Sequence, residues 1–169
     1  MTLEGRARVV GDDVNTDYII SSARKRATID AATLAPYLFE SIAPGLAATV
    51  QAGDLLVAGR NFGCGSAMEV AATVIQAAGF RAVLAASFAR SFYRNAINNG
   101  LLAIECDTSD ILEGDTISVE SDTSGTTVVD ERTGRRELRA PLGGIAGEIL
   151  AAGGLVPYLK RERRFVSTT

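Results

Sequence analysis

The most constraining feature of the sequence is a glycine-rich tract that lies between a short apolar run and an alanine-rich segment. Residues 55–58 (LLVA) are all apolar and end at Gly59, which indicates a short buried strand. Residues 69–78 place apolar side chains at helical spacing and stop at Gly79, a residue type common at helix C-termini. The tract between them, residues 60–68, therefore joins a strand to a helix, as in α/β domains.

The next segments extend this unit. Residues 82–86 (AVLAA) are predicted as a second buried strand, and residues 87–99 as a second helix that ends at Gly100. Residues 101–106 are predicted as a third short strand. The middle of the chain is thus predicted as β-loop-α-β-α-β.

The N-terminal third is predicted to be less regular. Residues 5–10 alternate polar and apolar side chains as a strand does, and residues 11–17 (GDDVNTD) are predicted as an acidic, turn-rich loop. Residues 21–28 (SSARKRAT) show no periodic pattern and are predicted as an exposed basic loop. Asp30 is a suitable N-cap for a helix over residues 31–40.

The C-terminal third predicts a β-hairpin and a helix. Residues 116–120 and 126–129 are short strands joined by a turn, and Gly134 lies in a second turn. Residues 145–152 are predicted as a helix that stops at the following pair of glycines. The last ten residues are mostly polar and are predicted to be mobile.

Composition limits the classes of protein to which the chain can belong. Its 169 residues, 47% of them hydrophobic, suit a single domain over residues 1–169. The formal net charge of −3 argues against nucleic acid as a partner, because phosphate backbones require a basic surface. Charges near the N-terminus are unlike a signal peptide, and no run approaches the roughly 20 apolar residues of a membrane helix. We therefore expect a cytoplasmic protein without membrane association.

The chain contains no histidine, and its two cysteines are Cys64 and Cys106. It therefore cannot build a Ser-His-Asp triad, a Cys-His pair or a histidine-ligated metal site by itself. Two thiolates are too few to hold an iron–sulfur cluster, so we expect this chain to bind no metal or cofactor of its own. The sequence leaves a disulfide between the two cysteines open.

The segment Gly63-Cys64-Gly65-Ser66 is a candidate anion site, because backbone N–H groups and the positive end of the predicted helix converge there. Its small residues also let another molecule approach the backbone closely. The spacing matches neither a Walker loop nor a dinucleotide fingerprint. Two simpler interpretations stay open: Ser66 is only a helix N-cap, or Cys64 is only a small residue in a tight loop.

Four stretches of the chain together resemble one protein family. Residues 61–66 (NFGCGS) resemble the signature loop of the small subunits of 3-isopropylmalate dehydratase and related members of the aconitase superfamily. Residues 11–20 resemble the aspartate-rich N-terminal loop of that family, and residues 86–101 resemble its second helix. Residues 152–156 (AGGLV) resemble its C-terminal motif, so the resemblance covers nearly the whole chain in the family's order.

The resemblance implies an α/β fold, namely a swivelling β/β/α three-layer domain similar to the mobile C-terminal domain of aconitase. It also implies a hydro-lyase that interconverts hydroxy-dicarboxylic acids such as 2- and 3-isopropylmalate, a step of leucine biosynthesis. The [4Fe–4S] cluster is expected in a separate large subunit, with which this chain would form a heterodimer or heterotetramer. The alternatives are a homoaconitate, dimethylmalate or citramalate dehydratase subunit, a non-catalytic swivel subunit, and a free-standing anion-binding module.

The same resemblance implies roles for individual residues. Ser66 matches the family serine whose alkoxide takes a proton from the carbon beside a carboxylate. Thr16 and Asp17 match positions that support this catalytic site. Gly63, Cys64 and Gly65 are expected to bind the substrate through their backbone.

The chain departs from the family at Ala67 and Met68, where the usual sequence has serine and arginine. The usual arginine clamps a substrate carboxylate with two hydrogen bonds, which a methionine cannot do. Arg24, Lys25 and Arg26 are the candidate replacements, and a basic loop would favour an anionic group on the substrate. The alternative is that these three side chains are only a solvated charge run.

Overall fold

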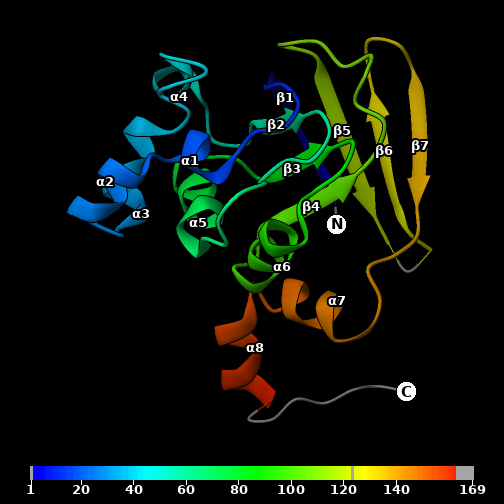
Figure 1. Cartoon of the computed structure of the whole chain (residues 1–169). Helices are drawn as coiled ribbons and strands as arrows, with labels where there is room; N and C mark the ends of the chain where they lie inside the picture. Colours follow the sequence, from blue (N-terminus) through cyan, green and yellow to red (C-terminus); the bar gives the residue numbers. More distant parts are fainter. Residues whose placement is uncertain (1, 123, 163–169) are drawn as a thin grey trace.

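Figure 1 shows the computed structural model of the chain, which describes residues 2–122 and 124–162. The predicted β-loop-α-β-α-β unit is confirmed and corresponds to β2 through β4. In chain order the elements are β1 (Thr2–Val9), α1 (Thr16–Ile19), α2 (Ser22–Ala27), α3 (Ala31–Leu34), the 3-10 helix η1 (Ala35–Tyr37), α4 (Leu46–Thr49), β2 (Leu55–Ala58), α5 (Glu69–Ala77), β3 (Ala82–Ala85), α6 (Arg90–Asn98), β4 (Leu102–Glu105), β5 (Thr116–Ser121), β6 (Thr126–Asp130), β7 (Arg135–Arg139), α7 (Gly144–Ala151) and α8 (Leu155–Glu162).

The strands of the described residues form one seven-stranded sheet in the order β4-β3-β2-β1-β5-β6-β7. The strands from β4 to β1 are parallel, whereas β1, β5, β6 and β7 pair antiparallel. β1 belongs to both halves, because Gly5 lies opposite Ile117 of β5 and Val9 lies opposite Val57 of β2. The sheet therefore changes from parallel to antiparallel along a single strand.

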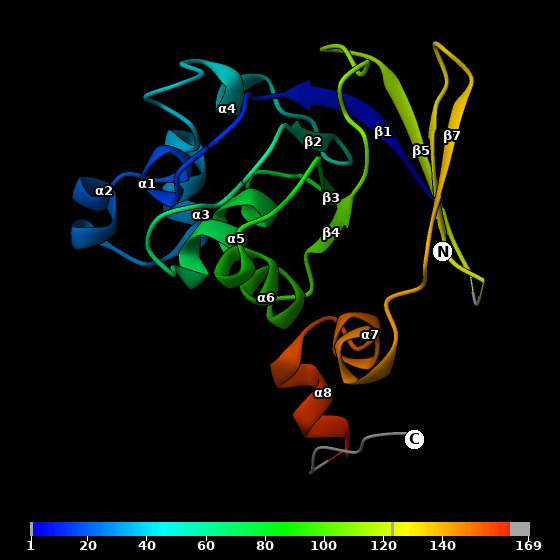
Figure 2. The same cartoon turned by 45° about the vertical axis from the view of Figure 1, so that its right-hand side comes forward.

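The curl of the sheet produces three layers, with the helices on one side, the parallel strands between, and the antiparallel strands on the other side (Figure 2). Successive strand residues point to opposite faces. Leu56 and Val83 accordingly face the helices in one apolar core, whereas Leu55 and Leu84 face Ile117 of β5 in a second core. Parallel strands buried on both faces explain the uninterrupted apolar runs of the sequence. The predicted β/β/α arrangement is confirmed.

The terminal helices α7 and α8 pack beside α6 at the lower end of the molecule in Figures 1 and 2. Their contact is a third, smaller cluster around Ile97, Ile149 and the fully buried Tyr158. Among the described residues, no helix combines the length and apolar composition that a membrane span needs.

Two predictions in the N-terminal third were wrong. Residues 21–28, predicted as a loop, contain helix α2, because Ser21 caps the helix at the amide of Arg24 and the alanine, arginine and lysine residues after it favour helix. The helix predicted over residues 31–40 is capped by Asp30 as expected. It is however short and continues as the 3-10 turn η1 at Pro36.

Later boundaries also differ from the predictions. The helix predicted from residue 87 begins only at Arg90, because the backbone groups of Ser87 and Ala89 bond to Phe62 in an extended segment. Strand β7 was not indicated by the sequence pattern, and α8 occupies the first part of the tail that was expected to be mobile. The rest of that tail, residues 163–169, lies outside the described residues.

Candidate active site

The glycine-rich loop and the acidic N-terminal loop lie side by side, because they follow the carboxyl ends of the neighbouring parallel strands β2 and β1. Two backbone hydrogen bonds join the loops. The N–H group of Thr16 donates to the Cys64 carbonyl at 2.8 Å, and that of Gly63 donates to the Val14 carbonyl at 2.9 Å. Two of the stretches that resembled the family are thus in direct contact.

Two glycines of the loop have backbone conformations that disfavour any side chain. The φ angles of Gly63 and Gly65 are +77° and +91°. A Cβ atom on Gly63 would lie 2.3 Å from the ring of Phe92, and one on Gly65 would lie 2.5 Å from the side-chain amide of Asn15. Phe92 is itself held edge-to-face against Phe62, with ring centroids 4.9 Å apart. The loop is therefore fixed between a buried aromatic cluster and Asn15.

Ser66 is exposed, and its hydroxyl makes no hydrogen bond to any residue that the structure describes. Helix α5 begins at Glu69, as predicted, with Met68 as its N-cap, so the N-cap interpretation of Ser66 was wrong. Within the described chain, the amides of Gly65, Ser66 and Ala67 also lack a hydrogen-bond acceptor. Such a run of unpaired N–H groups around a left-handed glycine is suited to an anion.

Thr16 contacts the Gly65-Ser66-Ala67 segment through its side chain. Its side chain is buried, and its hydroxyl donates to the carbonyl of Ser66 at 3.0 Å. The neighbouring Asn15 caps helix α1 by accepting a hydrogen bond from the amide of Asp17 at 2.9 Å. The sequence patterns did not indicate Asn15, although an asparagine side chain typically accepts a hydrogen bond from the backbone amide two residues on. Thr16 thus positions the Ser66 backbone.

Asp17 faces helix α2. Its Oδ1 atom accepts hydrogen bonds from the Ser22 hydroxyl at 2.6 Å and from the Lys25 ammonium at 2.9 Å. The hydrogen bond from Ser22, and then that from Lys25, hold the pKa of Asp17 below its usual value. Asp17 is therefore an ionised carboxylate that pairs with Lys25.

The three cations predicted to replace the family arginine are placed very differently. Lys25 has a side chain that is 13% exposed, and its Nζ atom contacts Met68 Sδ as well as Asp17. Arg24 forms an ion pair with Glu40 at 3.0 Å and lies over a tyrosine ring. Arg26 is exposed. Of the three, Lys25 is the cation that lies against the end of the glycine-rich loop.

A groove opens next to this lysine, between α2 and α5. Its volume is about 490 Å³. Apolar and polar side chains both contribute to its wall, which consists of Lys25, Ile29, Met68, Glu69, Val70 and Thr73.

Both cysteines are free thiols, so the disulfide that the sequence left open is absent. Burial, assisted by the nearby Glu137, raises the pKa of Cys106 to about 12 and keeps this residue a neutral thiol. Within residues 2–122 and 124–162, no group of three or more His, Cys, Asp or Glu side chains is arranged to hold a metal ion. The described residues therefore do not fit an iron–sulfur cluster, and its place in a large subunit stays a prediction.

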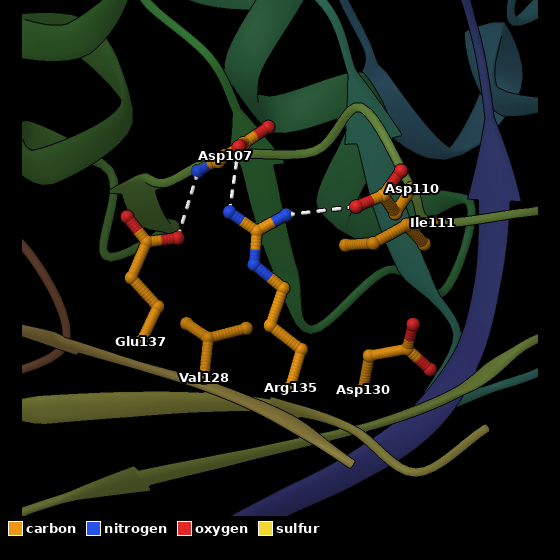
Figure 3. A pocket seen from close by; sticks show the side chains of 7 residues that line it. All are labelled: Asp107, Asp110, Ile111, Val128, Asp130, Arg135 and Glu137. Atoms are coloured by element: carbon orange, nitrogen blue, oxygen red, sulfur yellow. Dashed lines mark hydrogen bonds and ion pairs between the residues drawn. The ribbon is translucent and has the colours of Figure 1, made fainter. Parts of the chain in front are cut away.

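A second pocket, shown in Figure 3, lies where charged side chains join strand β7 to the loop after β4. Arg135 of β7 bonds to Asp107 at 2.6 Å and to Asp110 at 3.1 Å, and the amide of Asp107 donates to Glu137 at 2.8 Å. The cavity measures about 10 Å³, which is room for a single water molecule. These side chains satisfy one another and tie β7 to the loop after β4.

Known proteins match this chain along nearly its whole length. Residues 43–109 match the aconitase C-terminal domain family. The chain is 44% identical to the methanogen homoaconitase small subunit of Methanocaldococcus jannaschii, over 96% of this chain and 94% of that protein. It is 43% identical to the 3-isopropylmalate dehydratase small subunit of Moorella thermoacetica, over 96% of this chain and 97% of that protein. The crystal structure of 3-isopropylmalate dehydratase from Methanocaldococcus jannaschii is similar with a TM-score of 0.89, at 43% identity over 96% of both chains.

The three-layer fold and its glycine-rich loop define a domain of the aconitase type. More particularly, the chain belongs to the family of small subunits of 3-isopropylmalate dehydratase and homoaconitase, which are hydro-lyases. The predicted fold class, family and enzyme class are thereby confirmed. The roles of single residues stay predictions.

Proposed function

We propose that this chain is the small subunit of a hydro-lyase that removes water from a hydroxy-dicarboxylic acid such as isopropylmalate and adds it back at the neighbouring carbon. The proposed partner is a large subunit carrying a [4Fe–4S] cluster, which would supply Lewis-acid chemistry for the hydroxyl group. The names of two relatives, both of them small subunits, support such an assembly. The observation that carries the proposal is the exposed Gly65-Ser66-Ala67 segment, which is held in place by Thr16.

In this proposal Ser66 takes the proton from the carbon beside a substrate carboxylate. A serine alkoxide is strongly basic, so an enzyme must stabilise its negative charge. The unpaired amides of Gly65, Ser66 and Ala67 support this role, because fixed N–H dipoles favour negative charge next to them. Thr16 is a positioning residue, since its hydroxyl bonds to the carbonyl of Ser66. The substrate carboxylate would receive hydrogen bonds from the same loop.

The proposal is tested by co-expressing the chain with a cluster-bearing large subunit from the same organism and measuring dehydration of 3-isopropylmalate. Ser66→Ala should reduce kcat by about 100-fold or more, because general-base catalysis typically contributes about 10²–10⁴-fold. Ser41→Ala is the matched control, since Ser41 is an exposed serine outside the loop, and it should leave kcat unchanged. A pair that dehydrates no hydroxy-diacid, or an active pair whose kcat is unchanged by Ser66→Ala, would overturn the proposal.

A second candidate substrate is homoaconitate, which the name of the 44% identical relative favours. It is an unsaturated tricarboxylate, so it carries one carboxylate more than isopropylmalate and would be assayed by hydration. A substrate panel that includes this tricarboxylate next to isopropylmalate, dimethylmalate and citramalate therefore separates the candidates by kcat/KM.

A further inference from the structure

We propose that Lys25 binds a substrate carboxylate in place of the arginine that the family usually has at position 68. The inference rests on the proposed function, because it assigns a substrate contact within the same site. It concerns the end of the glycine-rich loop, where α2 meets the N-terminus of α5.

The position of the lysine side chain is the first observation. Its Nζ atom contacts Met68 Sδ, so the ammonium group lies at the side chain that replaces the usual arginine. Helix α2 has no fully buried residue, yet the Lys25 side chain is only 13% exposed. Asp17 anchors the ammonium from the other side at 2.9 Å. The lysine is therefore directed at the loop instead of being solvated.

The neighbouring cations are placed so that they do not compete. Arg24 is committed to Glu40 through hydrogen bonds of 3.0 and 3.2 Å, and it lies over the ring of Tyr37. Arg26 is exposed on the same helix. The specific contact with Met68 thus distinguishes Lys25 from the two arginines on either side of it.

The ammonium also retains capacity for a ligand. It has one N–H donor beyond those directed at Asp17 and Met68, and a thioether is only a weak acceptor. A substrate carboxylate forms a stronger, charge-assisted hydrogen bond and would displace the sulfur atom. Because lysine is a point charge, this contact holds one carboxylate oxygen without the fork geometry of arginine.

The adjoining groove indicates the substrate class. Its volume of about 490 Å³ leaves room for a substituent beside Ile29 and Val70. The carboxylate of Glu69 lines the same groove and would repel a further negative charge there. The site therefore fits a hydroxy-dicarboxylic acid with an uncharged side group better than a tricarboxylic acid.

The test compares Lys25→Met with Lys160→Met, which removes the same charge from an exposed lysine of α8, in the assembly with the large subunit. Lys25→Met should raise KM for 3-isopropylmalate by about 10–100-fold, the range of a lost charge-assisted hydrogen bond, whereas Lys160→Met should change it by less than about twofold. The double variant Lys25→Met with Met68→Arg should restore KM, because it returns the family arginine. Unchanged urea midpoints of both single variants would show that folding is intact.

The outcomes separate this inference from the proposed function. An active wild-type pair in which Lys25→Met behaves like Lys160→Met would overturn the role of Lys25 and leave the proposed function standing. If the wild-type pair is inactive, the isolated chain is titrated with 3-isopropylmalate while the amide NMR signals of Gly65 and Ser66 are followed. Shifts that disappear in Lys25→Met would support the carboxylate contact, and shifts that persist or never occur would overturn it.

Discussion

At position 63 the backbone has a φ angle of +77°, and the ring of Phe92 occupies the space that a Cβ atom would need. Gly134 has a similar φ angle of +72° but nothing within 4 Å of such an atom. Comparing the two glycines thus separates two ways in which an added side chain would destabilise the fold. One cost is the left-handed backbone itself, and the other is the collision with the aromatic cluster under the loop.

Gly63→Ala should lower the free energy of unfolding by about 1–3 kcal/mol more than Gly134→Ala does, which is the usual cost of overpacking. Both variants carry the backbone cost, so their difference reports the collision with Phe92. The measurement is urea unfolding at equilibrium with unchanged m-values. Equal midpoints for the two variants would show that the loop moves away from the ring at no cost.

Strand β1 carries a charged network at the scale of the element. Arg8 is 7% exposed, and its guanidinium bonds to Glu113 at 2.6 Å and to Asp54 at 3.4 Å. Arg6 bonds to the same Asp54 at 2.8 Å, and the amide of Gln51 donates to it at 3.0 Å. Asp54 therefore connects the start of β2 to β1, the strand along which the sheet changes from parallel to antiparallel.

Asp54→Asn should lower the free energy of unfolding by about 1–3 kcal/mol, because it leaves buried guanidinium donors with a weaker acceptor. Glu120→Gln is the control: it removes a carboxylate 3.7 Å from Arg136, and both side chains are more than half exposed. Such an exposed pair contributes about 1 kcal/mol or less. Thermal or urea unfolding at pH 7 compares the two variants.

The same variant should change the response to acid. Burial favours the neutral form of Asp54, but the hydrogen bonds from Arg6, Gln51 and Arg8 together lower its pKa below the ordinary value of 3.8. The stabilisation is therefore present above pH 3.8 and is lost as the pH falls through the lower pKa of the folded state. Wild-type protein should lose stability more steeply than Asp54→Asn on acidification below about pH 4. Parallel pH profiles would contradict this assignment.

At the scale of the whole molecule, the two large cores lie on opposite faces of the parallel strands, and the α7–α8 pair forms its own small cluster. Tyr158 is fully buried in that cluster, and its hydroxyl donates to Glu148 at 3.1 Å. Stability is commonly uneven across such a structure, and a small peripheral cluster opens before a central sheet does.

Tyr158→Ala should therefore destabilise α7 and α8 locally, by about 3–5 kcal/mol as for other large-to-small core changes. Amide hydrogen exchange should accelerate in these two helices and stay slow in β2, β3 and β4. Tyr158→Phe keeps the ring and should have a much smaller effect. The same loss of protection in β3 as in α8 would mean that the molecule opens as one unit.

Sequence patterns predicted the elements whose signals are local. Leu55 to Ala58 and the stops at Gly79 and Gly100 are such signals, because strand burial and helix termination depend on a few neighbouring residues. The basic segment of α2 was misjudged, since its helix depends on a single capping serine at Ser21. Strand β7 is exposed along most of its length, so it lacks the apolar alternation that reveals a strand.

The candidate active site was likewise only partly predictable from the sequence. The family resemblance singled out Ser66, Thr16 and Asp17, but not how they are related in space. The structure connects the Thr16 hydroxyl to the Ser66 carbonyl, and it directs Asp17 to Lys25 instead of to the serine. No local pattern contains that information.

The sequence by itself determined the strand–loop–helix units, the need for glycine in the loop, and the family. These follow from residue type and short-range spacing. Only the tertiary structure decided that Thr16 meets a carbonyl 50 residues away and that Lys25 meets Met68, 43 residues away. The physical reason is that both contacts depend on β1 pairing beside β2, a long-range choice made by burial on both faces of the sheet.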